Sequence, residues 1–401
     1  MNPSVIIPIT YPYRTYIKQV YLLTESDVHN SIGHVYQLSN GWKAYKLGLQ
    51  ELFAYLEKNP LSYININKIV AFPGTRTNES IFNLNREPKW YIGYGSEFND
   101  YVKAAKEVKS NNVFIPHHIM DELCCRYIKG VELKQADLKV YQIIQQEEFV
   151  ASMVVVSGGI RHKNSQGEIV FEHYPMRLNK HLDGWSDYGK MSCWPKEKKA
   201  QIISSHDGGK IIQFDYRSFV VSTIFNLLGE RISGYENMGE KKDVLTVLYG
   251  DYLFDDISYP PAFKILMTKE QLTKICMLKR KVIEDSKIGY IENPFGYQIK
   301  IPPDTPRKNI FAYYIRSVQA FVVKAAMGRV AKTLAKEFKG KALVLGVIWD
   351  SILVDISKEL VDNDSGICND AIKRIGDVMG KPLREYGYVW YYDVSMEALN
   401  D

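Results

Sequence analysis

The alternation of apolar and polar residues divides the second half of the chain into strands and helices. Residues 343–356, LVLGVIWDSILVDI, are apolar on both sides of a Trp-Asp-Ser centre, which predicts two strands that meet at a turn. Residues 208–230, GGKIIQFDYRSFVVSTIFNLLGE, predict a strand that runs into a helix. Residues 386–395, YGYVWYYDVS, predict a final strand. We therefore expect an α+β fold in this half, with helices packed on a small antiparallel sheet.

Apolar residues that recur every three or four positions predict the helices. Residues 317–338, SVQAFVVKAAMGRVAKTLAKEF, predict a long helix, and residues 262–287 and 365–383 predict two more. Residues 40–59, NGWKAYKLGLQELFAYLEKN, have the same spacing, and helices are also expected between residues 115 and 150.

The first 110 residues are rich in tyrosine and combine that helical stretch with strand-like segments. The strand-like segments are residues 5–11, 63–74 and 89–95. We expect a small mixed α/β domain here, and a partner protein or DNA is a candidate ligand for it.

Composition limits the class of protein more than it defines the function. The chain has 401 residues, of which 46% are hydrophobic, so it can bury a large core. A net charge of +5 permits a polyanionic partner without requiring one. Five cysteines are an odd number, which disfavours a disulfide framework and favours a reducing, cytoplasmic location, that of the host cell if the source is a virus. No apolar run is long enough to span a membrane.

Two aspartates stand at the ends of predicted strands. Asp215 ends an apolar strand just before a helix, and Asp350 lies at the turn between two apolar strands. A lone buried carboxylate is unfavourable by several kcal/mol unless it caps a turn or meets a cation. Both explanations remain open at this point: turn residues, or a divalent-cation site if the fold brings the two strand ends together.

The order of five segments resembles the motifs of family A (Pol I-like) DNA polymerases. FDYRSF, which contains Asp215, resembles the family motif DYSQIELR, and LVLGVIWDSILVDI resembles LLQVHDELVFEV. Residues 289–304, GYIENPFGYQIKIPPD, are similar to GYVETLFGRRRYIPD, and SVQAFVVKAAMGRV resembles IQGTAADIMKLAMVRV. YPMRLNK lies where the family has TGRLSS. The resemblance covers roughly residues 150–400. It implies a right-hand polymerase, short enough to suit a phage or mobile element, that extends a primer with dNTPs on a DNA primer–template.

The resemblance also implies roles for individual residues. Asp215 and Asp350 would be catalytic acids that bind two Mg²⁺ or Mn²⁺ ions, and the backbone carbonyl of Tyr216 would be a further metal ligand. Arg177 and Gln319 would contact the primer–template.

Cationic side chains are candidates for phosphate contacts. The family uses a fingers-helix cation to hold the incoming triphosphate, and Lys264 lies near that place, although a solvated lysine explains it equally well. Lys198 and Lys199 belong to the basic cluster WPKEKKAQ, and Arg161 follows the glycines of SGG. Glycine lets backbone amides approach a phosphate closely, but a plain loop is an equal explanation for Arg161.

The chain departs from the family pattern in three places. Val220 stands where the family has a glutamate that excludes the ribose 2′-hydroxyl of the incoming nucleotide. The second acid lies in WDS and not in HDE, and the RxxxKxxxFxxxY pattern is absent around Lys264. Two alternatives therefore stand beside a DNA polymerase. One is a single-subunit RNA polymerase or primase-like enzyme on the same palm, and the other is a catalytically degenerate nucleic-acid-binding replication factor.

The domain organisation follows from these assignments. We expect an N-terminal domain over residues 1–110, thumb-like helices over 111–155, the first part of an antiparallel-sheet palm over 156–230, reduced helical fingers over 231–288, and the second part of the palm over 289–401. No DxE strand motif of a proofreading exonuclease is present in the sequence.

Overall fold

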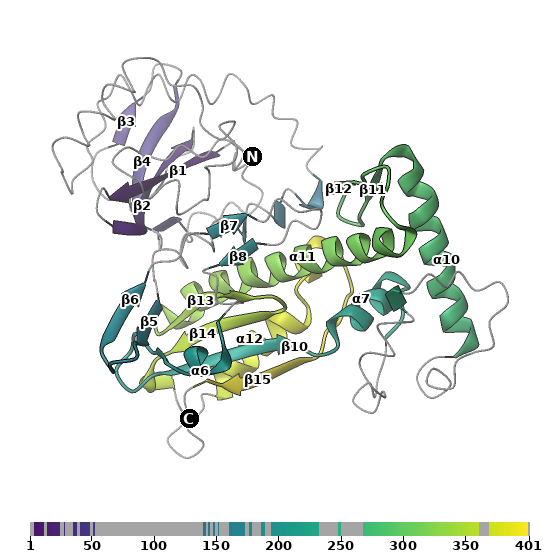
Figure 1. Cartoon of the computed structure of the whole chain (residues 1–401). Helices are drawn as coiled ribbons and strands as arrows, with labels where there is room; N and C mark the ends of the chain where they lie inside the picture. The colour runs from purple at the N-terminus through teal and green to yellow at the C-terminus, as the bar shows by residue number, and fades with distance from the viewer. Residues whose placement is uncertain are drawn as a thin grey trace.

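A computed structural model gives the structure of the chain (Figure 1). It describes residues 4–11, 14–24, 28, 35–37, 41–48, 51–52, 139–141, 143–144, 147–148, 151, 160–172, 176–178, 186–188, 194–231, 248–249, 268–360 and 369–399.

A four-stranded antiparallel sheet is the centre of the second half of the chain. Its strand order is β13-β14-β10-β15, formed by β13 (Ala342–Ile348), β14 (Ser351–Ile356), β10 (Lys210–Tyr216) and β15 (Val394–Ala398). Every residue of β14 is buried, as expected of an apolar strand that is covered on both faces of a sheet. The expected α+β class is confirmed.

Helices cover one face of this sheet. The long helix α11 (Arg307–Thr333) runs across it, with α7 (Phe219–Leu227), α10 (Lys269–Asp285) and α12 (Asn369–Gly380) packed around it (Figure 1). Most of α11 is buried, which is typical of a helix that is apolar on all sides. Inward-facing residues of the sheet belong to the same core as α11; they include Ile212, Phe214, Tyr216, Val347, Ile352 and Val354.

A second, smaller core lies on the opposite face of the sheet. There a three-stranded sheet packs, of order β6-β5-β9, formed by β6 (Ile169–Glu172), β5 (Ile160–Lys163) and β9 (Ile202–Ile203), with α6 (Lys196–Lys199) beside it. The two layers meet through six buried apolar residues: Ile160, Ile202, Ile211, Leu345, Ile348 and Leu353. The central sheet is therefore covered on both faces by elements that are distant in sequence.

The N-terminal sheet contradicts one expectation from the sequence. It has the order β1-β2-β4-β3 and comprises β1 (Ser4–Tyr11), β2 (Arg14–Thr24), β3 (Val35–Gln37) and β4 (Lys43–Gly48). The helix expected over residues 40–59 is wrong for 43–48, which pair antiparallel with the β-branched and aromatic strand β2.

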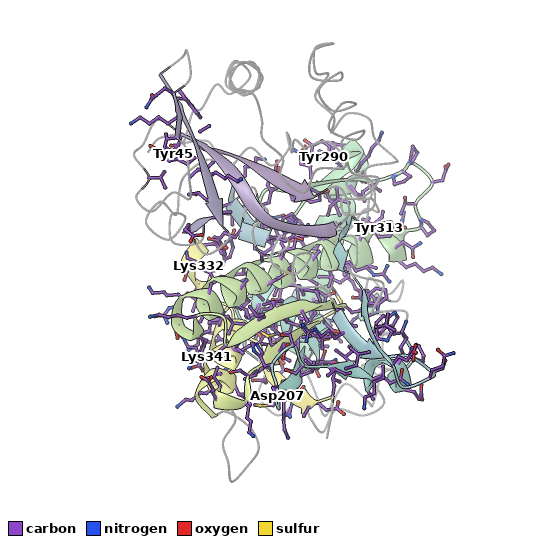
Figure 2. All side chains as sticks on the ribbon, turned by 90° about the vertical axis from the view of Figure 1, so that its left-hand side faces the viewer. Tyr45, Asp207, Tyr290, Tyr313, Lys332 and Lys341 are labelled. Atoms are coloured by element: carbon purple, nitrogen blue, oxygen red, sulfur yellow. The ribbon has the colours of Figure 1, made fainter. Side chains whose placement is uncertain are left out.

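Figure 2 shows Tyr45 of β4 above α11 and Asp207 below the central sheet.

The last strand also begins later than expected. β15 starts at Val394, whereas the sequence predicted a strand over residues 386–395. The side-chain amide of Asn226 donates to the backbone carbonyl of Tyr391 at 2.9 Å and accepts from its backbone N–H at 3.1 Å. The backbone N–H of Tyr392 donates to the Gly380 carbonyl at 2.9 Å. These contacts remove the segment from the sheet ladder.

The remaining elements are short. They are β7 (Met176–Leu178), β8 (Ser186–Tyr188), the hairpin of β11 (Tyr290–Glu292) and β12 (Gln298–Lys300), the 3₁₀ turns Ser286–Ile288, Lys358–Leu360 and Arg384–Tyr386, and the π-helical turn Leu334–Phe338 that ends α11. The proposed domain boundaries stay predictions, because residues 53–138 and most of 232–267 lie outside the described residues. Among the described helices, none is long and apolar enough to cross a membrane.

A glycine in α11 lets a second helical segment approach closely. A Cβ built on Gly328 would lie 2.9 Å from the Cβ of Glu147, closer than two such atoms can pack. Nearby, the Nζ of Lys324 lies 3.3 Å from a carboxylate oxygen of Glu148, and both side chains are about nine-tenths buried or more, with 7% and 6% exposed. The close approach therefore brings a buried ion pair together.

Gly328→Ala should lower the free energy of unfolding by about 1–3 kcal/mol, because the added methyl overpacks this contact. Gly376→Ala is the matched control: it also lies in a helix, but a Cβ there meets nothing within 4 Å. Alanine at 376 should raise stability by roughly 0.5–1 kcal/mol. Urea unfolding of both variants measures the difference, and equal effects would contradict the close approach.

Candidate functional site

The pairing of β10 with β14 brings Asp215 and Asp350 to the same end of neighbouring strands. Asp215 is the second-last residue of β10 and lies opposite Ser351, the first residue of β14. Asp350 directly precedes Ser351, in the two-residue turn between β13 and β14. The backbone N–H of Tyr216 donates to the carbonyl of Asp350 at 3.3 Å. Both aspartates are partly exposed.

Tyr216 holds the end of β10 in the orientation that turns Asp215 away from the helical core. Its ring stacks on Phe219 with centroids 4.6 Å apart, and its hydroxyl donates to the carbonyl of Met379 at 3.0 Å. Burial raises the pKa of the Tyr216 phenol well above its usual value, so the group remains a neutral donor. Because side chains alternate along a strand, Asp215 points to the opposite face.

A small group of polar side chains fixes the backbone around the two aspartates. The amide of Gln213 donates to the hydroxyl of Ser351 at 3.1 Å, and that hydroxyl donates to the carbonyl of Ile348 at 2.8 Å. On the other flank, the hydroxyl of Ser395 donates to the backbone carbonyl of Asp215 at 3.3 Å. Ser351 is only 1% exposed, so it supports the turn from beneath and does not face solvent.

Backbone strain concentrates at this site. Of the described residues other than glycine, three have positive φ: Ser218 (51°), Lys339 (44°) and Trp349 (54°). Lys339 follows the end of a helix, where a left-handed residue is common. Trp349 directly precedes Asp350, and Ser218 follows Asp215 by three residues, at the start of α7. Each such conformation is unfavourable by about 1–3 kcal/mol. Strained positions of this kind cluster at active sites and ligand clamps.

The donor set fits a hard divalent cation that binds phosphate. Two carboxylates and a neighbouring backbone carbonyl, that of Tyr216, supply only oxygen ligands. Mg²⁺ is commonly held by one or two carboxylates, with substrate phosphates and water completing its shell. Within the described ranges there is no group of three or more His, Cys, Asp or Glu side chains that could hold a metal without such help.

A third carboxylate on the same face of the sheet has a different role. Asp355 is completely buried and accepts hydrogen bonds from the hydroxyl of Ser204 at 2.5 Å, and from the backbone N–H and hydroxyl of Ser205, both at 2.6 Å. Its oxygens are used to anchor the turn before β10, so it is a structural group.

Three basic candidates lie in the smaller layer, on β5 and α6. Arg161 lies on β5 and is exposed, and Lys199 is half-buried in α6. The Nζ of Lys198 lies 3.9 Å from the ring centroid of Trp194, which packs on the smaller core. That core covers the same face of the central sheet as Asp215.

The other sequence candidates divide into three groups. Val220 is half-buried in the first turn of α7 and packs against the main core. Gln319 is only 4% exposed inside α11, so the expected contact with a primer–template does not fit its burial. Arg177 belongs to β7, but its side chain lies outside the described residues, as does all of Lys264.

The sequence analysis missed the supporting residues Gln213 and Ser395. Alternation along KIIQFDY does place Gln213 on the same face as Asp215, so that signal was present in the sequence. Ser395 is different, because only the register of β15 against β10 brings it opposite Asp215.

The bond between Gln213 and Ser351 can be measured with a double-mutant cycle. Gln213→Ala, Ser351→Ala and the double variant should give a coupling energy of about 0.5–1.5 kcal/mol in urea unfolding, the usual net value of one hydrogen bond. Additive effects of the two substitutions would mean that the bond does not support the turn.

Comparisons with known proteins do not assign the chain to a family. No protein-family model matches the chain, and no curated protein matches it. One similar solved structure is the POL domain of Pol1 from M. smegmatis in complex with DNA primer-template and dNTP. It has a TM-score of 0.42 and 12% sequence identity, with 87% of this chain and 65% of that chain covered. The chain thus spans less than two thirds of that protein's length, and at this level of similarity no conclusion about activity follows.

Proposed function

We propose that this protein is a template-directed nucleotidyltransferase that extends a DNA primer with dNTPs. The observation that carries the proposal is the placement of Asp215 and Asp350 at one end of the sheet, joined by the backbone bond from Tyr216 to Asp350. These are the two acids that the resemblance to family A polymerases singles out. The central antiparallel sheet would be the palm, with a reduced thumb before its first part in sequence and reduced fingers between its two parts.

The chain's own residues position the reacting groups. Asp215, Asp350 and the carbonyl of Tyr216 would hold Mg²⁺ or Mn²⁺ ions, with substrate phosphates as further ligands. When bound, two such ions activate the attacking primer hydroxyl and stabilise charge on the pyrophosphate that leaves. Ser351, supported by Gln213, fixes the turn that presents Asp350. Positioning of this kind is the main contribution a protein makes to phosphoryl transfer.

Basic side chains would hold the nucleic acid through its phosphates. We assign this role to Arg161, Lys198 and Lys199 in the adjacent layer, and to Arg177 on β7. Phosphate contacts carry no sequence information and weaken with salt, so binding should be sequence-tolerant and strongly dependent on ionic strength. A partner protein at the N-terminal sheet remains part of the proposal.

A second candidate is an RNA polymerase or primase-like enzyme on the same sheet. The residues that favour it are Val220, in place of the glutamate that excludes ribose, and the WDS sequence at Asp350. A degenerate nucleic-acid-binding replication factor is the third candidate, because the fingers pattern around Lys264 is absent.

Asp215→Ala and Asp350→Ala should each reduce primer extension at least about a hundredfold, since removal of a metal ligand removes several kcal/mol of transition-state stabilisation. The assay uses a primed template, Mg²⁺ or Mn²⁺, and all eight nucleotides. Asp207→Asn is the matched control: it removes an exposed carboxylate before the opposite end of β10 and should leave extension unchanged.

Full extension by both alanine variants would exclude catalysis at this site. Strict use of NTPs with a start that needs no primer would instead favour the RNA polymerase candidate.

Val220→Glu should make the enzyme more selective against ribonucleotides. The unmodified protein is expected to incorporate both NTPs and dNTPs, because a valine neither binds nor repels a 2′-hydroxyl as a glutamate does. The substitution should lower NTP use relative to dNTP use by about tenfold or more, about 1.4 kcal/mol in the transition state. Ser222→Glu places the same charge two residues further along α7 and is the control. An unchanged NTP/dNTP ratio in the Val220 variant would show that this position does not contact the sugar.

A further inference from the structure

Trp349 is the most unusual residue at the carboxylate pair. It occupies the first position of the turn between β13 and β14 with φ of 54°, and its side chain is 64% exposed. The strand residues that flank the two-residue turn, Ile348 and Ser351, are both buried. The turn therefore displays one large aromatic side chain next to Asp350.

Neither turn chemistry nor packing explains a tryptophan at this position. Two-residue hairpin turns that need a positive φ favour Gly, Asn or Asp, which adopt that conformation with little strain. A bulky aromatic residue with positive φ is a genuine outlier. Burial usually compensates such a choice, but most of this side chain remains in contact with solvent. Residues that break a local rule without a folding benefit are expected at functional sites.

Trp194 provides an internal contrast. Its ring packs against the smaller apolar core and is covered by the Nζ of Lys198, at 3.9 Å from the ring centroid. Contacts within the chain therefore explain why a tryptophan stands at position 194. Trp349 has a free aromatic surface, directly beside the residue that we propose as a catalytic acid.

We propose that the indole of Trp349 stacks on a nucleobase at the end of the nucleic-acid strand that the carboxylate pair holds. The proposal rests on the proposed function, because the strand end must lie at Asp350. Every nucleobase presents a flat π face, so stacking on an indole tolerates any sequence. Phosphate contacts fix the register of a strand but do not touch its bases, so the terminal base needs a contact of its own to be held. Trp349 would thus position the primer terminus without reading it.

The test compares two substitutions on two duplexes. Trp349→Asn removes the ring and introduces a residue that accepts positive φ, whereas Trp349→Phe keeps an aromatic face. A fluorescently labelled primer–template is titrated with each protein in Mg²⁺ and without nucleoside triphosphates, so that affinity is measured without catalysis and the ions that hold the strand at the carboxylates are present. The second duplex is identical but carries an abasic nucleotide at the primer 3′ end.

Trp349→Asn should weaken binding of the intact duplex about 5- to 150-fold, the range expected for loss of one base–aromatic stack. Trp349→Phe should retain most of the affinity. On the abasic duplex the unmodified protein should bind no better than Trp349→Asn. The melting temperature of Trp349→Asn should be unchanged or higher, since strain is relieved, which separates a lost contact from a damaged fold.

Three results would overturn the stacking contact. They are equal affinity of the unmodified and Trp349→Asn proteins for the intact duplex, the same loss on both duplexes, and a change of sedimentation coefficient in Trp349→Asn that shows the ring joins two copies of this chain. If any of them occurs while primer extension still depends on Asp215, only this inference fails. If the unmodified protein neither extends a primer nor binds the duplex, the proposed function fails with it.

Discussion

The antiparallel register of β10 against β14 is the constraint on which the rest of this structure depends. It joins segments that are far apart in sequence, so the chain must close a long loop before the pairing gives any stabilisation. Side chains alternate with a period of two, and a slip of one residue would turn Asp215 into the helical core and move Phe214 and Tyr216 to the opposite face of the sheet. The stacked ring of Tyr216 and its bond to Met379 therefore stabilise the correct register, and with it the face that carries the carboxylates.

Aspartates lie in two different environments on this face of the sheet. Asp355 accepts three short hydrogen bonds from Ser204 and Ser205 and is sealed from solvent. Asp215 and Asp350 lie at strand ends with part of their surface exposed. A buried carboxylate needs such donors to be tolerated, whereas an exposed one is available to a cation. The position of an aspartate along its strand therefore distinguishes the structural Asp355 from the candidate metal ligands Asp215 and Asp350.

The sequence predicted the central sheet, the long helix and the location of both aspartates, because these depend on long, regular apolar patterns. It failed where tertiary contacts override local spacing. Residues 43–48 have helical spacing but pair with β2. The backbone of the segment before β15 forms hydrogen bonds with Asn226 and Gly380 and not with a neighbouring strand. The burial of Gln319 depends on how α11 is covered on every side, which no single helical pattern reveals.

The buried pair of Lys324 and Glu148 has a consequence for how related chains diverge. Loss of one partner leaves an uncompensated charge in the interior, which is unfavourable by about 3–5 kcal/mol, while replacement of both by apolar residues is often neutral or better. Substitution of Lys324 or Glu148 alone would therefore remove a large part of the free energy of unfolding. Among descendants of this fold, the two sites should therefore change together, as a linked pair of substitutions that joins the helical segment at 148 to α11.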